Sequence, residues 1–222
     1  MHQAIAILPF LALSAIAADK TVDPALDTSL KTAATQLDRL ALLPDDKQWS
    51  FDFTAQQSYT FSPGSVVNAN AATFPAAVGN GQTMATINLG PCSMLPPHYH
   101  PRASNFVVGV TGNVTTYMIQ ENSARLVTET LSPGKMTIFP QASVHSMVNN
   151  DCSANAQLIS ALSSEDAGTH NIANALFQLP DSIRNAAFGN PSGGVPAFNV
   201  PTVGFGAIQG DPACLAKCNK SP

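Results

Sequence analysis

Two histidines one residue apart are the first feature of this chain that could do chemistry. His98 and His100 lie in the stretch PPHYHPRASN, residues 96–105, of a chain with only five histidines. Residues i and i+2 of a β-strand point to the same face, so the two imidazoles can be directed at one place. The prolines stiffen the segment. Taken alone, however, an H-x-H spacing is as typical of a hydrogen-bonded surface pair that binds no metal.

Two further residues extend the pair to a complete ligand set. Asn105 lies five residues after His100, and His145 lies forty residues after Asn105, in the stretch FPQASVHSMVNN. Three imidazoles and an oxygen donor suit manganese, iron, copper or zinc. A site for one divalent transition-metal ion built from His98, His100, Asn105 and His145 is therefore chemically sensible.

The order and spacing of these residues resemble the two conserved motifs of the cupin superfamily. The first motif corresponds to His98, His100, Asn105 and Gly112, and the second to Gly134, Pro140, His145 and Asn149. PHYHPRASN is most similar to the germin-like branch, where the segment reads PHxHPRASE. The resemblance spreads over residues 45–190. It implies a secreted, single-barrel protein of spherulin or germin type, in which three histidines and a glutamate hold one metal ion, usually manganese. Mapped onto this sequence, the resemblance implies that the ligands of one divalent transition-metal ion are His98, His100, Asn105 and His145.

Asn105 stands where that family has its glutamate. A glutamate would cancel one charge of a divalent ion, whereas an amide offers only a neutral carbonyl oxygen. Mn²⁺ should lose most by the exchange, and Cu²⁺ or Zn²⁺ should better tolerate three histidines with a weak fourth ligand. The neutral ligand shell should attract small anions. Two alternatives stay open: Asn105 bonds to a ligand or bound water, or it has no metal role.

The resemblance also bears on which reaction the site could perform. Oxalate oxidases of the family carry two asparagines before the first motif that hold the substrate. Aligning FPAAVGNGQTMATINL with that region places Val78 and Ala85 there, and neither side chain can donate a hydrogen bond. The open classes are a non-catalytic cell-wall or storage protein that binds metal, and a metal-dependent oxidoreductase. Within the second class, superoxide dismutation is favoured over oxalate oxidation.

Other residues near the motifs have simpler interpretations. Arg102 could steer an anion or form a surface salt bridge, and Tyr99 should face away from the two histidines. His170, in AGTHNIAN, is expected to be an ordinary surface histidine. Met147 and Phe139 flank the second motif and are expected to line the cavity above the metal.

A barrel of short strands must position these side chains. Between Trp49 and Cys152, short apolar or alternating runs are separated by glycine, proline and asparagine, which is typical of a barrel or sandwich. With the resemblance, the expected fold is all-β: a single antiparallel cupin β-barrel, or jelly roll. The predicted strands include Thr83–Leu89, Asn105–Val110, Val114–Ile119, Arg125–Thr130, Met136–Phe139 and Ala156–Leu162.

Helices and less regular segments are expected on either side of the barrel. Asp27–Leu43 has a helical apolar stripe, a capping residue in Asp27 or Thr28, and a stop at Pro44. Two short C-terminal helices are predicted over Ile172–Phe177 and Asp181–Phe188, the second capped by Asp181. The expected divisions are residues 1–18, a signal peptide; 19–48, a helical extension; 49–190, the barrel with its C-terminal helices; and 191–222, an extended Gly/Pro-rich tail.

Several features predict secretion into the extracellular space or cell wall. An apolar run from Ala4 to Ile16 precedes small residues, as in a signal peptide, with a retained anchor as the alternative. Four cysteines follow it and suit two disulfides in an oxidising compartment. Glycosylation sequons occur at Asn113 and Asn219.

The resemblance also bears on how the four cysteines pair. In a cupin barrel the segments that contain Cys92 and Cys152 are neighbours, so the resemblance implies a Cys92–Cys152 bond and a local Cys214–Cys218 bond in the tail.

The charge of the chain limits its binding partners. The net charge is −4, and the ten lysines and arginines form no cluster, which argues against nucleic acid or an anionic membrane as a partner. The expected partners are a small anion and a further copy of the chain.

Overall fold

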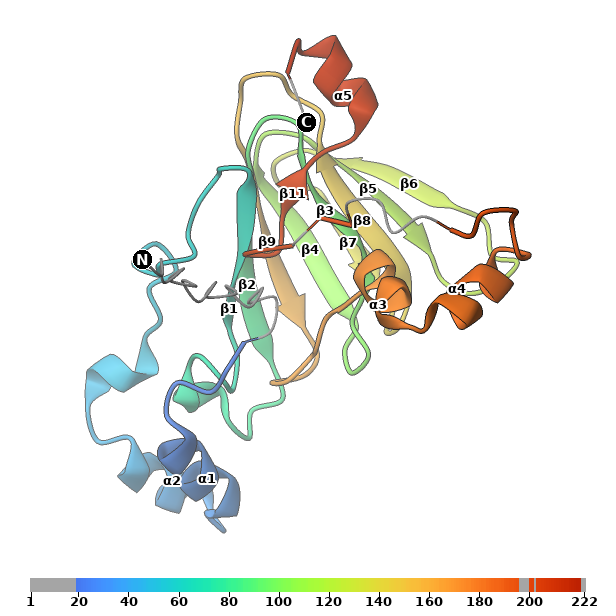
Figure 1. Ribbon diagram of the computed structural model, residues 1–222. Helices are drawn as coiled ribbons and strands as arrows, with labels where there is room; N and C mark the ends of the chain where they lie inside the picture. The colour runs from blue at the N-terminus through green and yellow to red at the C-terminus, as the bar shows by residue number, and fades with distance from the viewer. Residues whose placement is uncertain (1–18, 196–199, 202, 221–222) are drawn as a thin grey trace, which may run out of the picture.

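Two antiparallel sheets enclose the core of this protein, as the computed structural model shows for residues 19–195, 200–201 and 203–220 (Figure 1). The five-stranded sheet has the order β1 (Gly64–Ala69), β2 (Thr83–Leu89), β9 (Ala156–Leu162), β4 (Asn105–Thr111) and β7 (Met136–Phe139). The six-stranded sheet runs β10 (His170–Asn171), β3 (Ser93–Tyr99), β8 (Val144–Asn149), β5 (Val114–Ile119) and β6 (Val127–Leu131), and β11 (Ile208–Gln209) pairs with β3. The all-β antiparallel fold is confirmed.

Alternation along the strands decides which side chains face the interior. On β4, Asn105 and Val107 are buried while Phe106 between them is exposed, and on β9 Leu158 and Ser160 are buried. Polar Asn105 and Ser160 thus share the inward face with apolar neighbours. The core itself consists of Ile87, Leu89, Leu95, Val107, Val114, Leu131, Phe139, Met147, Ala156, Leu158 and Ala207.

The N-terminal extension forms two helices where the sequence predicted one. Helix α1 (Pro24–Thr32) begins at Asp23, whose carboxylate accepts from the Leu26 amide, and helix α2 (Gln36–Leu42) begins at Thr35. Thr35 and Asp38 form a reciprocal capping box, which starts a new helix and ends the old one. The expected caps, Asp27 and Thr28, are therefore wrong. Two short 3₁₀ turns follow, η1 (Asp46–Trp49) and η2 (Pro75–Ala77).

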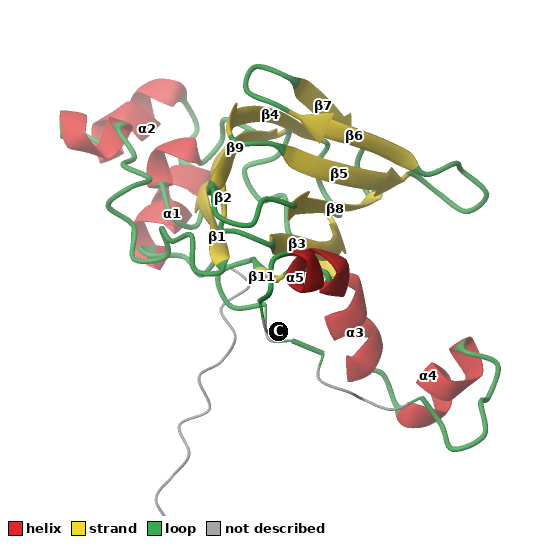
Figure 2. Ribbon diagram, turned by 90° about the horizontal axis from the view of Figure 1, so that it is seen from above, coloured by secondary structure: helices red, strands yellow, loops and turns green. Residues whose placement is uncertain are grey.

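The two short helices after the barrel are confirmed as α3 (Ile172–Gln178) and α4 (Asp181–Ala187). Asp181 does not cap α4, because Pro180 is the N-cap and no side chain bonds there. The Asp181 carboxylate instead pairs with Arg184 at 2.8 Å. Seen from above, α3 and α4 extend away from the barrel, on the side opposite α1 and α2 (Figure 2). Among the described helices, none combines the length and the apolar character that a membrane crossing requires.

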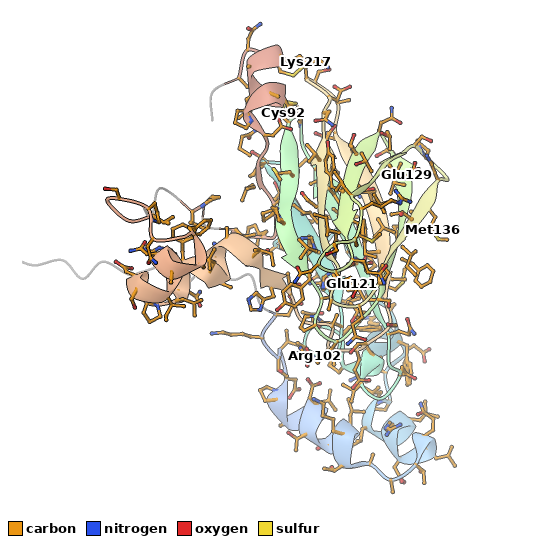
Figure 3. All side chains as sticks on the ribbon, turned by 90° about the vertical axis from the view of Figure 1, so that its right-hand side faces the viewer. Cys92, Arg102, Glu121, Glu129, Met136 and Lys217 are labelled. Carbon is orange, nitrogen blue, oxygen red and sulfur yellow. A yellow bond between two sulfur atoms is a disulfide. The ribbon has the colours of Figure 1, made fainter. Side chains whose placement is uncertain are left out.

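The chain end is not the loose tail that the sequence suggested. Helix α5 (Pro212–Lys217) docks on one end of the barrel and buries Cys214 and Leu215. Figure 3 shows Lys217 on α5 and Cys92 at one end of the barrel, and Arg102 at the opposite end.

The expected disulfide pairing is wrong because α5 docks on the barrel. The bonds are Cys92–Cys214 and Cys152–Cys218. Cys214 lies in α5 and Cys218 is its C-cap, four residues later, so the two side chains lie on the same side and both point at the barrel. Cys92 and Cys152 are neighbours as expected, with the Cys92 amide donating to the Asp151 carbonyl, but each bonds to the helix. The two bonds fasten α5 to the barrel.

Candidate metal centre

Three histidine side chains meet between the two sheets. His98 on β3 and His145 on β8 are direct partners in the antiparallel register. His100 follows β3 at the start of the bend that leads to β4. The ring centroids are 4.3 Å apart for His98 and His145, and 5.3 Å from each of these to His100. One ring nitrogen from each histidine lies within 4.8 Å of the others. The H-x-H pair is therefore part of a three-histidine cluster.

Every Nδ1 atom in the cluster is engaged by a backbone carbonyl. The distances are 2.8 Å from His98 Nδ1 to Pro96 O, 2.7 Å from His100 Nδ1 to Gly168 O, and 2.9 Å from His145 Nδ1 to Ser143 O. A carbonyl can only accept, so each Nδ1 carries the proton. Each Nε2 then keeps a free lone pair, which is the form that binds a metal.

Burial keeps the rings neutral. Desolvation lowers the pKa of His145 to about 4, and it lowers the pKa of His98 well below 6.5, with the nearby His145 and His100 adding to the effect. The pKa of His100 is also lowered by burial, although its bond to Gly168 opposes the shift. Neutral imidazoles are ready to bind a cation without first losing a proton.

An unsatisfied nitrogen shows that the cluster fits a metal ion. His145 Nε2 is fully buried and has no hydrogen-bond partner. A buried polar atom without a partner is costly, and a bound cation would satisfy it. Zn–N bonds are about 2.0–2.1 Å, so ligand nitrogens on one ion lie about 3–4 Å apart. The three ring nitrogens here all lie within 4.8 Å of one another, which is compatible with one shared ion. Phe139 stacks on the His145 ring with centroids 4.2 Å apart and fixes its plane.

Asn105 approaches the histidines from the facing sheet. It is the first residue of β4 and almost fully buried, and its Nδ2 lies 3.5 Å from His100 Nε2. Its Oδ1 accepts a hydrogen bond from the Ser160 hydroxyl on β9. In this arrangement the amide turns its NH₂ group toward the cluster. A half-turn about Cβ–Cγ would present Oδ1 instead, with Nδ2 donating to Ser160.

A cavity of about 170 Å³ opens beside the cluster. Met147 lines it, as expected, and so does Ala85, whereas Val78 is buried in a separate apolar cluster with Leu30. Asn68, which is the register partner of Ala85 on β1, supplies an amide to the cavity. The alignment placed apolar Val78 and Ala85 where the oxalate oxidases have two asparagines. The polar side chains that line this cavity come from other positions, which include Asn68, Thr169 and Asn171.

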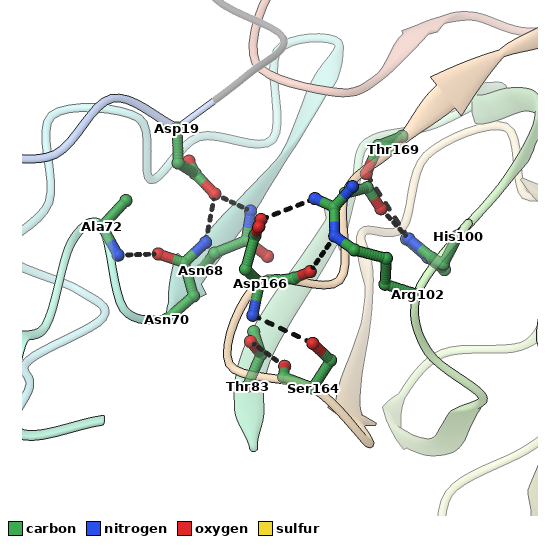
Figure 4. Close-up of polar contacts among 11 residues, drawn as sticks. Asp19, Asn68, Asn70, Ala72, Thr83, His100, Arg102, Ser164, Asp166 and Thr169 are labelled. Carbon is green, nitrogen blue, oxygen red and sulfur yellow. Dashed lines mark hydrogen bonds and ion pairs between the residues drawn. The ribbon is translucent and has the colours of Figure 1, made fainter. Parts of the chain in front are cut away.

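A wider cavity of about 500 Å³ adjoins the first. Asp19, Asn68, His100 and Thr169 line both cavities. Asp19 Oδ2 accepts from Asn68 at 2.8 Å and from Asn70 at 2.6 Å (Figure 4). Burial raises the pKa of the Asp19 carboxyl, against the effect of these two bonds. The segment before α1 thus brings a carboxylate to the junction of the two cavities.

The remaining residues near the motif lie outside the cluster. Tyr99 faces away from the three histidines and stacks on His170, with ring centroids 4.9 Å apart. His170 is exposed, as expected. Arg102 forms an ion pair with Asp166 at 2.7 Å, so of its two interpretations the structure shows the salt bridge. The sulfur atoms of Cys92, Cys214 and Cys218 also lie close together near α5, but all three are engaged in disulfides.

Ser160, Gly168 and Asn68 were not found from the sequence. Each lies far along the chain from the residue it serves, and serine, glycine and asparagine are too common in loops and strands to signal a role. Only the strand register brings Ser160 beside Asn105.

Comparison with known proteins agrees with this geometry. The cupin family matches residues 53–191. Spherulin-1A of Physarum polycephalum is 33% identical over 162 residues, 72% of this chain and 65% of the spherulin. Germin-like protein 3-1 of Oryza sativa subsp. japonica is 33% identical over 171 residues, 75% of this chain and 70% of that protein.

A solved structure of an oxalate oxidase shares the fold. Its TM-score is 0.61 at 22% identity, over 67% of this chain and 77% of that one. The chain spans slightly less than two thirds of the length of the spherulin. The family match covers the segments that contain all three histidines and Asn105. This chain belongs to the cupin family, and spherulins and germin-like proteins are among its relatives.

Proposed function

We propose that this chain is a secreted germin-like cupin that binds one divalent transition-metal ion inside its barrel. The Nε2 atoms of His98, His100 and His145 are the ligands, and Asn105 occupies the position next to them. The observation that carries the proposal is the convergence of three neutral imidazoles whose Nδ1 atoms are all engaged, with His145 Nε2 buried and unsatisfied.

The identity of the ion follows from the charge of the ligands. Manganese is the ion implied by the germin-like resemblance, but three imidazoles and an amide bring no negative charge. Copper and zinc form stronger bonds to such a ligand set. We therefore propose that the site prefers Cu²⁺ or Zn²⁺ over Mn²⁺ when all three are offered at equal concentration.

Electron paramagnetic resonance of the copper-loaded protein tests the ligand set. Three nitrogen ligands are expected from the hyperfine pattern, and each single histidine-to-alanine variant should lose one. The H170A variant is the matched control, because His170 is exposed and stacked on Tyr99 outside the cluster. A copper signal identical in the parent and in the H145A variant would refute the assignment.

The second candidate function is oxidoreduction of a small anion. A redox-active ion would supply one-electron chemistry and a coordination position for the substrate. The observation that favours this function is the 170 Å³ cavity, where Asn68, Thr169 and Asn171 lie beside the histidines. A divalent ion held only by neutral ligands keeps its full positive charge, which would attract the superoxide anion. Oxalate oxidation is a weaker alternative, and a non-catalytic cell-wall or storage role is the third.

Activity assays on fully loaded protein distinguish these roles. The parent, loaded in turn with manganese and copper, is assayed for superoxide dismutation and for oxalate consumption. Activity that disappears in the H98A variant assigns the chemistry to the site. Loaded protein that shows neither activity favours the storage or cell-wall role.

We also propose that the chain, with its two disulfides, is secreted and carries glycans at Asn113 and Asn219. Both asparagines are exposed, Asn113 in the turn between β4 and β5 and Asn219 after α5. Glycosidase treatment of protein collected from the culture medium should lower its mass. An N113Q variant should lose one glycan.

A further inference from the structure

The three histidines differ in how their rings are held. His98 and His145 each use a carbonyl two residues earlier in their own segment, from Pro96 and Ser143. His100 uses the carbonyl of Gly168, which is 68 residues away along the chain. The local bonds form whenever their strands form. The orientation of the His100 ring depends instead on where a distant loop lies.

Arg102 holds that loop through three hydrogen bonds. Its Nε donates to the Asp166 carbonyl at 2.6 Å, and its guanidinium donates to Asp166 Oδ1 at 2.7 Å. Its backbone amide donates to the Ala167 carbonyl at 3.2 Å. All three acceptors lie in the two residues that precede Gly168, and Figure 4 shows Arg102 between Asp166 and the His100 contact.

Gly168 fits tightly against the same arginine. Its φ is +67°, in the left-handed region that glycine adopts without strain. A Cβ atom added there would lie 2.8 Å from an Arg102 guanidinium nitrogen and 3.1 Å from Pro101. The guanidinium therefore occupies the space beside Gly168, and a larger side chain at that position would displace it.

The Arg102–Asp166 pair is a poor candidate for a stabilising device. Both side chains are more than half exposed, and surface ion pairs typically contribute about 0–1 kcal/mol to folding. Its geometry has a local consequence, because it fixes the acceptor that selects the tautomer of a metal-facing imidazole. Changes in such outer partners typically alter metal affinity about 10- to 100-fold.

We propose that Arg102 is a positioning residue for His100. By holding residues 166–168, it keeps the Gly168 carbonyl on His100 Nδ1 and so directs an unprotonated Nε2 into the cluster. The role in metal binding rests on the proposed function, but the effect on the His100 tautomer exists in the metal-free protein.

The test records the tautomer of each histidine in metal-free protein labelled with ¹⁵N-histidine, at pH 8. The parent should show His100 as the single Nδ1–H tautomer. The R102A variant should show a mixture at His100, with His98 and His145 unchanged. Zinc affinity, measured on the same samples, should fall about tenfold.

Matched variants separate positioning from general effects. The K135A variant removes an ion pair of similar exposure, Lys135–Glu129 at 2.6 Å, which lines neither cavity beside the cluster, and should leave both readouts unchanged. The R102K variant should restore part of the effect, and D166A should give a smaller change because the Asp166 carbonyl stays. If R102A does not fold, R102K and D166A are compared with K135A in its place.

Two results would overturn the proposal: an R102A spectrum and zinc affinity equal to those of the parent, or the same changes in K135A. If the parent binds no zinc, the proposed function fails, and the tautomer of His100 in R102A still decides the role of Arg102.

Discussion

His98 and His145 lie directly opposite each other on the neighbouring strands β3 and β8, and each donates its Nδ1 proton to a carbonyl two residues earlier. One pair of strands thus builds half of the candidate metal centre from local geometry. His100 and Asn105 lie beside this pair, His100 in the bend after β3 and Asn105 on the facing sheet. The burial of the three imidazoles has consequences for the stability of the metal-free protein.

The metal-free protein should lose stability as the pH falls from about 6.5 to about 4. In the unfolded chain each histidine has a pKa near 6.5, whereas burial lowers the pKa of His145 to about 4 in the folded state. Below pH 6.5 the unfolded chain takes up protons that the folded chain excludes, so the equilibrium shifts toward unfolding. Above that pH the effect vanishes. His145 alone should cost roughly 2 kcal/mol by pH 5.

Urea denaturation of chelator-treated protein at pH 8 and pH 5 measures this loss. The H145N variant should show a smaller difference between the two pH values, and the H170N control should match the parent. A difference in H145N as large as in the parent would show that another group is responsible.

Glutamate at position 105 should raise the affinity for Mn²⁺. The Asn105→Glu variant adds an anionic oxygen beside three neutral imidazoles, and we expect Mn²⁺ to bind at least about tenfold more tightly. Asn105→Gln is the matched control, because it has the length of glutamate without the charge. Titration calorimetry compares the three proteins. Equal affinities of the Glu and Gln variants would mean that charge at this position does not limit manganese binding.

Both disulfides should stabilise the fold by fastening α5 to the barrel. Cys92–Cys214 spans 122 residues and Cys152–Cys218 spans 66, which correspond to about 5 and about 4 kcal/mol in the chain-entropy model. Replacing either pair with serines should lower the free energy of unfolding accordingly. Peptide mapping without reduction should recover these two links, and a peptide that joins Cys92 to Cys152 would contradict the structure.

The regular part of the fold could be predicted from local sequence. Val114–Ile119, Met136–Phe139 and Ala156–Leu162 have the same limits in the prediction and in the structure, because each run has an asparagine or a proline directly beside one of its ends. His98 and His100 could be identified because two imidazoles at spacing i, i+2 share a face, and the resemblance to germin-like cupins added His145 and Asn105.

Contacts between distant segments could not be predicted. The disulfide pairing depends on where α5 docks, and a Gly/Pro-rich segment gives no apolar period from which its docking site follows. The Gly168 bond to His100 depends on a loop held by Arg102. The break between α1 and α2 is different, because the Thr35–Asp38 capping box is a local signal that the longer apolar stripe obscured.

Metal stoichiometry tests directly whether His98, His100 and His145 together bind one metal ion. The protein is stripped with a chelator, reloaded with excess Zn²⁺, desalted and measured by elemental analysis beside its triple variant H98A/H100A/H145A and the H170A control. One zinc ion per chain is expected in the parent and in H170A, and almost none in the triple variant. A triple variant that retains one ion per chain with the affinity of the parent would contradict this assignment.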